Sequence, residues 1–309
     1  MIGQAKTKVT AAWCAAALAA LSPLTRAAGT DAQDGRQLDS ITVEAQKQRE
    51  AAERQASAFV SAIAVQPYEQ SLARWNTPIC PLVAGLPRSQ GEFVLARLSQ
   101  IVAIAGAPLA PENCRANFYV VATRDPDALL KKWRNRDRNM FGNASEPKIG
   151  RFLGASRPVR VWYNAPLREA TGMPLTVDGL NILGNGPVIG TFYSGVPANI
   201  HAKLSPLQWD ELQSLVSVIV IIDTRHAQGI NFGQLADYVA MVGLAEVRLD
   251  ADLSAVDSIL RVFAAAHGAA PPGLTPWDQA FLKALYHTDQ SDRMQVSMIK
   301  GEVSRAIAP

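Results

Sequence analysis

Residues 234–244 have the sequence QLADYVAMVGL, and the segment VSVIVII at 216–222 lies shortly before them. In the first stretch, apolar residues follow the i, i+3, i+4, i+7 spacing of a helix with one buried face: Leu235, Tyr238, Val239 and Val242. The second stretch is a short run of Val and Ile, which predicts a fully buried strand. We expect this strand and helix to form the core around which the rest of the chain folds.

Strands and helices alternate on both sides of this pair. Apolar runs predict strands at 79–84, 117–122 and 158–163, and the dipeptide Asn185-Gly186 predicts the tight turn of a hairpin. Capping residues and apolar stripes predict helices that begin near residues 89, 125, 205, 254, 275 and 291. The buried stripe expected for the helix from residue 89 is Val94, Leu98, Ile101, Val102 and Ala105. The pattern favours an α+β, α/β-like domain over residues 70–309. Its mixed β-sheet would be packed by helices, and a helical C-terminal tail would start at about residue 252.

The segment before this domain contains a second amphipathic pattern. Residues 47–67 predict a helix that ends at Pro67, with an apolar side formed by Ala52, Ala56, Phe59, Val60 and Ile63. Residues 29–46 are polar and rich in Asp, Gln and Thr, which predicts a flexible linker.

The first 28 residues have the pattern of a secretory signal peptide. Lys6 and Lys8 precede an apolar run at 9–21, which is too short to span a bilayer, and small residues follow at 27–29. We expect cleavage within Ala27–Gly29, a periplasmic or secreted mature protein, and membrane contact only through the signal peptide.

The charge balance excludes one class of partner. The first 28 residues hold three of the 30 Lys and Arg residues and no Asp or Glu, so 27 basic side chains remain against 27 acidic ones. A balanced surface creates no field that would attract nucleic acid or an anionic membrane, and we therefore expect no nucleic-acid partner.

A basic cluster stands out within this balance at the end of the helix predicted from residue 125, at Lys131, Lys132, Arg134, Arg136 and Arg138. The cluster is compatible with a site for an anionic ligand or a lipid headgroup. The interpretation that we favour is a solvated helix end, where the helix dipole stabilises cations.

Two cysteines remain after the signal peptide, Cys80 and Cys114. In an exported protein an even pair predicts a disulfide bond, and here the bond would join the starts of two strands that lie close together. A redox pair is the alternative, but such pairs are usually spaced as C-x-x-C.

The helix at 234–244 also has the outline of the zinc motif H-E-x-x-H-x-x-G with its ligands replaced. Ala236 and Ala240 occupy the two histidine positions, Asp237 the glutamate position and Gly243 the glycine position. Alanine offers no lone pair to a metal, so we expect no zinc and no other cofactor.

Candidate groups for acid–base chemistry are Asp223, His226 and Asp237, because the end of the strand and the start of the helix would bring them together. The alternative is that Asp223 caps a turn and that His226 lies on a solvated loop.

These residues resemble the catalytic half of zincin metalloproteases that have lost their ligands. The tail LTPWDQAFLKALY at 274–286 is similar to the closing segment of uncharacterised exported bacterial proteins with a zincin-like domain that lacks the zinc-ligand histidines. The resemblance covers about residues 70–290. It implies a zincin-like fold without the metal on which the family's chemistry depends, and it transfers no catalytic residue to this chain.

Three hypotheses follow. The first is an exported pseudoenzyme, a non-catalytic zincin-like domain that binds an envelope protein or peptide or organises the envelope. The second is a cell-envelope hydrolase that uses a non-standard site of Asp223, His226 and Asp237. The third is an adaptor that docks through the helix beginning at Lys47, which would then pack loosely on the domain.

Overall fold

The computed structural model of the 309-residue chain describes residues 31–66, 70–169, 176–177, 180–181, 211–264 and 269–308. The predicted signal peptide and the turn at Asn185-Gly186 lie outside these residues. The chain divides into two units, Met1–Ala45 and Gln46–Pro309, and the fold described below is that of the second unit.

The described helices, in chain order, are α1 Asp31–Ile63, α2 Arg88–Ala105, α3 Pro126–Arg136, the 3₁₀ turn η1 Arg138–Phe141, α4 Glu146–Leu153, α5 Phe232–Leu244, the 3₁₀ turn η2 Ile259–Arg261, α6 Pro276–His287 and α7 Gln295–Ile307. The described strands are β1 Arg74–Trp75, β2 Pro81–Ala84, β3 Phe118–Thr123, β4 Val159–Asn164, β5 Leu167–Glu169, β6 Thr176–Val177, β7 Leu180–Asn181, β8 Glu211–Leu215 and β9 Ser217–Asp223.

The main sheet has four strands in the order β2-β3-β9-β4. Strands β2, β3 and β9 are parallel, and β4 pairs with β9 in the antiparallel direction at one edge. A smaller three-stranded sheet has the order β1-β8-β5, and β6 pairs with β7. The predicted α+β class with a mixed sheet packed by helices is confirmed.

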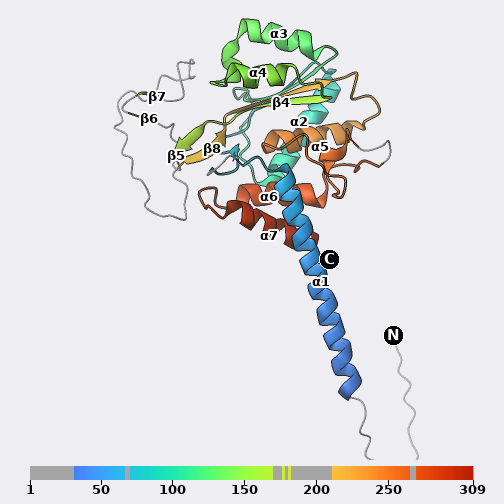
Figure 1. Ribbon diagram of the computed structural model, residues 1–309. Helices are drawn as coiled ribbons and strands as arrows, with labels where there is room; N and C mark the ends of the chain where they lie inside the picture. The colour runs from blue at the N-terminus through green and yellow to red at the C-terminus, as the bar shows by residue number, and fades with distance from the viewer. Residues whose placement is uncertain are drawn as a thin grey trace, which may run out of the picture. The chain divides into compact units, whose positions relative to one another are not determined.

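Helices cover both faces of the main sheet (Figure 1). On one face, α3, η1 and α4 enclose a small apolar cluster with Ile219 and Ile221 of β9. On the other face, Val218, Val220 and Ile222 of the same strand join the larger core. Successive side chains of a strand point to opposite faces, so β9 is apolar at every position from Val218 to Ile222.

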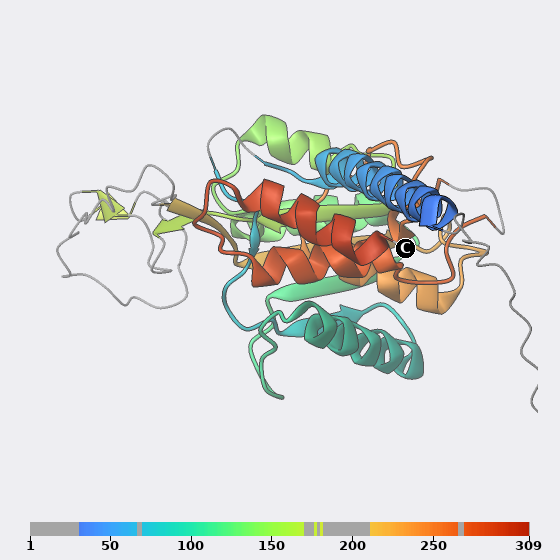
Figure 2. The same ribbon diagram turned by 90° about the horizontal axis from the view of Figure 1, so that it is seen from below.

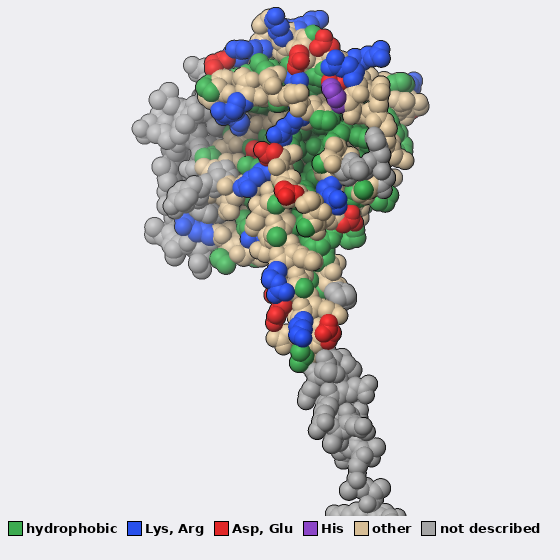
Figure 3. Space-filling model, turned by 45° about the vertical axis from the view of Figure 1, so that its right-hand side comes forward, with side chains coloured by type: hydrophobic (Ala, Val, Ile, Leu, Met, Phe, Trp, Pro, Cys, Tyr) green, Lys and Arg blue, Asp and Glu red, His purple; other side chains and the backbone are tan. Residues whose placement is uncertain are grey.

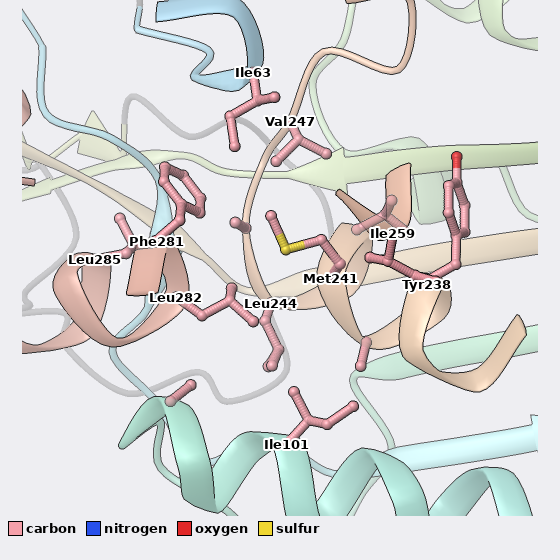
Figure 4. Packing of buried hydrophobic residues seen from close by; sticks show 14 of the residues in the cluster. Ile63, Ile101, Tyr238, Met241, Leu244, Val247, Ile259, Phe281, Leu282 and Leu285 are labelled. Atoms are coloured by element: carbon pink, nitrogen blue, oxygen red, sulfur yellow. The ribbon is translucent and has the colours of Figure 1, made fainter. Parts of the chain in front are cut away.

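The larger core lies between the sheet and the helices α2, α5 and α6. Helix α6 packs against α2 and α7, and Figure 2 shows α6 and α7 side by side. Figure 4 shows Ile101 of α2, Leu244 of α5 and Leu282 of α6 converging in this core. The stripe predicted for the second helix is buried as expected, at Val94, Leu98, Ile101, Val102 and Ala105.

Helix α1 differs from its prediction at both ends. It begins at Asp31, so residues that were predicted to form a flexible linker are helical, and it ends at Ile63 rather than Pro67. No proline interrupts residues 31–63, and Gln, Glu, Arg and Ala propagate a helix well. The end is set by a tertiary contact, because Ala64 forms a bridge with Val247.

The part of α1 that belongs to the second unit, residues 46–63, packs tightly against the rest of that unit. Phe59, Val60 and Ile63 are fully buried. The ring of Phe59 packs edge-on against those of Trp277 and Phe281, with ring centroids 5.6 and 6.2 Å apart. The adaptor hypothesis required a loosely packed helix here, so this packing counts against it.

Two further predictions were wrong in their local structure. The helix expected from residue 254 is only the short turn η2, because the carboxylate of Asp278 accepts hydrogen bonds from Ser258 Oγ and the Ile259 amide and fixes a different backbone path. Residues 211–215, at the end of the helix expected from 205, form strand β8, which pairs with β1 and β5.

Candidate functional site

The carboxyl ends of β3 and β9 meet at one edge of the main sheet. Thr123 and Asp223 are paired in register, and β4, which is antiparallel, starts at the same edge with the Asp223 amide donating to Pro158 O at 2.8 Å. Helix α3 begins at Pro126, directly after β3. Open α/β sheets bind ligands in the crevice beyond the carboxyl ends of their strands, so a ligand site is expected at this end of the sheet.

Arg160, the second residue of β4, contacts both α3 and α4 at this end of the sheet. Its side chain is only 7% exposed, and its Nη2 lies 2.7 Å from Oδ1 of Asp127 in the first turn of α3. Its Nη1 donates to the carbonyl oxygen of Leu153 at the end of α4, at 2.9 Å. Its Nε is buried without a hydrogen-bond partner among the described residues. Buried polar groups are nearly always paired, so this orphaned donor is unusual.

Beside Arg160 the surface is hollowed over about 550 Å³. One wall is a single face of α3, formed by Asp127, Lys131, Arg134 and Asn135. The other wall is the end of α4 and the turn that follows it, residues 153–156. A second, shallower hollow shares Lys131 and Asn135 with the first and continues over Lys132 and Arg136.

Cations dominate the lining of the larger hollow. Lys131, Arg134 and Arg160 line it against a single carboxylate, that of Asp127. Figure 3 shows Lys and Arg side chains gathered at the top of the molecule, where Figure 1 places α3 and α4.

The cations of this cluster differ in their pairing. Arg134 and Arg138 both bind Glu146 at 2.8 Å, and the hydrogen bond from Arg138 is the largest cause of the lowered pKa of that carboxyl. Among the described residues Lys131 has no hydrogen-bond or ion-pair partner, and neither does the side-chain amide of Asn135. The hollow therefore offers one ammonium and one amide that are available to a ligand.

Asp223 and His226 lie together at the same edge, as predicted. His226 Nδ1 is 3.0 Å from Asp223 Oδ2. Arg225 also binds Asp223, through its amide, Nε and Nη2 at 3.0, 3.1 and 2.8 Å. The Arg225 guanidinium is the main reason that the pKa of Asp223 is held well below its usual value. The hydrogen bond to Asp223 is the main cause of the raised pKa of Arg225, and the charges of Asp125 and Asp127 add to it.

Asp237 does not join this group, so the predicted trio is wrong in its third member. Its buried carboxylate accepts hydrogen bonds from Arg97 of α2 and, at 2.6 Å, from the Leu274 amide. Within the described residues no hydrogen bond or ion pair connects Asp237 to Asp223 or His226. Asp237 instead faces Arg97 of α2 and the segment before α6.

The four positions of the degenerate zinc motif are all buried. Ala236 and Ala240 are 1% and 0% exposed, and Gly243 lies against the ring of Phe118. Both oxygens of Asp237 are already bound. These residues do not fit a zinc ion. In the described ranges, no three His, Cys, Asp or Glu side chains are grouped closely enough to hold a metal.

The predicted disulfide is present between Cys80 and Cys114, whose Cα atoms lie 5.9 Å apart. It joins the residue before β2 to the approach to β3, its neighbour in the sheet. In the part of the chain that the structure describes, none of the helices has the length and apolar character needed to cross a bilayer.

The basic cluster was visible in the sequence, but the hollow was not. Arg160 is the decisive residue, and the sequence showed it only as one charge on a predicted strand. Its burial depends on α3 and α4 folding over it, and no local pattern encodes that contact.

No known protein family, curated protein or solved structure matches the chain. Its function therefore has to be argued from its own geometry.

Proposed function

We propose that the chain is an exported, non-catalytic binding domain, and that its ligand site is the hollow between α3, the end of α4 and the start of β4. The observation that carries the proposal is the lining of this hollow. Available donors, Lys131 and Asn135, stand beside the buried Arg160 at the edge of the sheet where ligands of α/β folds bind.

The burial of α5 supports a non-catalytic role. If the domain descends from a zincin-like fold, as its resemblance implies, the positions that would hold the metal have become core. Ala236 and Ala240 supply no ligand, and Asp237 serves as the counter-ion of Arg97.

Export is supported by the leader pattern and by the disulfide. Disulfides persist in oxidising compartments, and the pair Cys80–Cys114 is consistent with a periplasmic or secreted protein. Mass spectrometry of the mature protein from its native host should give an N-terminus within Ala27–Gly29; an intact leader on cytoplasmic protein would contradict export.

The site is tested by hydrogen–deuterium exchange of the exported protein with and without a fraction of envelope small molecules and peptides. We expect ligand-dependent protection of residues 126–136 and 153–160. Lys131→Glu should abolish it, whereas Lys283→Glu, a charge reversal of an exposed lysine on α6, should leave it intact. Protection confined to α5, or equal protection in both variants, would refute this location.

A second candidate function, an envelope hydrolase, is favoured by one contact. Asp223 orients the Nδ1 of His226, and 62% of the His226 side chain is exposed, so its Nε2 could act as a general base towards water. Ester and peptide substrates would test this candidate. Loss of hydrolysis in His226→Asn would support it, and equal rates in the two proteins would exclude it.

A further inference from the structure

We infer that the ligand of this hollow carries a phosphate group, which Lys131 and Asn135 contact directly. The inference rests on the proposed function, because it names the chemistry of the ligand at that same site. It assigns different tasks to the charged residues of the hollow, and each task follows from a contact or from the lack of one.

The helix dipole does not account for this cluster. Cations in the last turn of a helix are stabilised by its dipole, and this explains Arg134 and Arg136 at the end of α3. Lys131 lies in the middle of α3, and Arg160 is on a strand. Their position on one hollow therefore needs another reason, and a bound anion supplies one.

The charge of the hollow favours a dianion. Three cations face one carboxylate, so the lining of the hollow has a net charge of +2 before a ligand enters. A phosphate monoester carries nearly two negative charges at neutral pH and accepts hydrogen bonds on three oxygens. A monocarboxylate would neutralise only half of this charge.

Two of these cations are already fixed by protein carboxylates. Asp127 holds Arg160, and Glu146 holds Arg134. These carboxylates hold both guanidinium groups in place, so we assign them the positive field of the hollow, and the buried Nε of Arg160 is the one donor of that side chain left without a partner among the described residues.

Lys131 and Asn135 are the groups left to contact the ligand. They stand one helical turn apart on α3, and both lack a partner among the described residues. An ammonium and an amide at this spacing can donate to two oxygens of one phosphate. Both residues also line the shallower hollow, so the rest of the ligand has room to extend over α3.

Isothermal titration calorimetry on the mature, oxidised protein tests the inference, with inorganic phosphate and glycerol 3-phosphate as probes and acetate as the monoanion comparison. We expect a saturable signal for the phosphates that weakens with added salt, and none for acetate. Lys131→Gln should weaken binding about tenfold or more, because it removes a charge-assisted hydrogen bond. Asn135→Leu should weaken it several-fold, and Lys283→Gln on α6 should leave it unchanged.

A second arm identifies the source of the phosphate. Vesicles of phosphatidylcholine that contain phosphatidic acid, whose headgroup is a phosphate monoester, are compared with vesicles of phosphatidylcholine alone in a flotation assay. Binding of soluble phosphates alone indicates a small metabolite, and capture by the phosphatidic acid vesicles alone, lost in Lys131→Gln, indicates a lipid headgroup.

Absence of binding in both arms, or equal binding by wild type and Lys131→Gln, overturns the phosphate assignment. If an envelope component without a phosphate group still protects residues 126–136 and 153–160 from hydrogen exchange, the proposed binding function stands and only the phosphate assignment is wrong. If no envelope component protects the hollow, both fail.

Discussion

The Cα of Gly243 on α5 lies directly against the ring of Phe118 on β3, and a Cβ at position 243 would stand 1.9 Å from the ring carbon Cζ. Phe118 is fully buried and is stacked on Trp75, whose Nε1 donates to the carbonyl oxygen of Gly243 at 2.8 Å. The glycine position of the degenerate zinc motif is therefore set by helix–sheet packing.

Gly243→Ala should destabilise the protein by about 3 kcal/mol or more, because the ring has no space to move into and α5 would have to shift. Gly301→Ala on α7 is the matched control. No atom lies within 4 Å of its added Cβ, and alanine at that position should stabilise the helix by about 0.5–1 kcal/mol. Urea unfolding of the three proteins measures both effects, and a neutral Gly243→Ala would show that the two elements are less tightly packed.

Periodic apolar patterns predicted the parts of the fold that depend on burial alone. The strand at 216–222 became β9, and the stripe of α2 was correct to the residue, because a core-facing position must be apolar wherever its partners come from. The disulfide followed from the cysteine count and the expected pairing of two strands.

Long-range polar contacts were beyond sequence reasoning. The hydrogen bond from Ser258 Oγ to Asp278, which fixes the turn η2 where a longer helix was predicted, joins residues 20 positions apart. Arg97 and Asp237 are separated by 140 positions. Local spacing says nothing about such partners, so Asp237 was assigned to the wrong group and Arg160 was overlooked.

The side chains of Arg97 and Asp237 should be strongly coupled in energy. The two single substitutions should lower the free energy of unfolding by different amounts. Arg97→Ala leaves the carboxylate of Asp237, whose side chain is 2% exposed, without its counter-ion and should cost about 3–5 kcal/mol. Asp237→Asn should cost less, because the Arg97 side chain is 36% exposed and can still be hydrated.

A double-mutant cycle with chemical denaturation measures the coupling. The double variant should be more stable than the sum of the two single losses implies, by about 1–3 kcal/mol. Strict additivity would mean that the contact contributes nothing to stability.

The disulfide Cys80–Cys114 should contribute about 4 kcal/mol, since it closes a loop with a sequence separation of 34 residues. Replacing both cysteines with serine, or reducing the wild type with dithiothreitol, should lower the free energy of unfolding by similar amounts. Dithiothreitol should then have no effect on the double variant, which serves as its own control. A wild type that is insensitive to dithiothreitol under denaturing conditions would argue against the bond.

Acid should destabilise the protein in part through Asp223. Hydrogen bonds from Arg225 hold the pKa of the Asp223 carboxylate in the folded protein below its usual value of about 3.9. The stabilisation that the ionised Asp223 contributes to folding is therefore complete above that pH. It is lost as the pH falls from about 4 towards the folded-state pKa. Asp223→Asn should therefore be less stable than wild type at pH 7. Its free energy of unfolding should fall less between pH 5 and pH 2, so that the two stability curves converge.

The variant His226→Asn is the control. Because Arg225 is the main cause of the lowered pKa of Asp223 and His226 a smaller one, His226→Asn should keep most of the wild-type acid dependence. Urea unfolding at a series of pH values gives these slopes, and parallel curves for wild type and Asp223→Asn would show that Asp223 binds protons equally in the folded and unfolded chains.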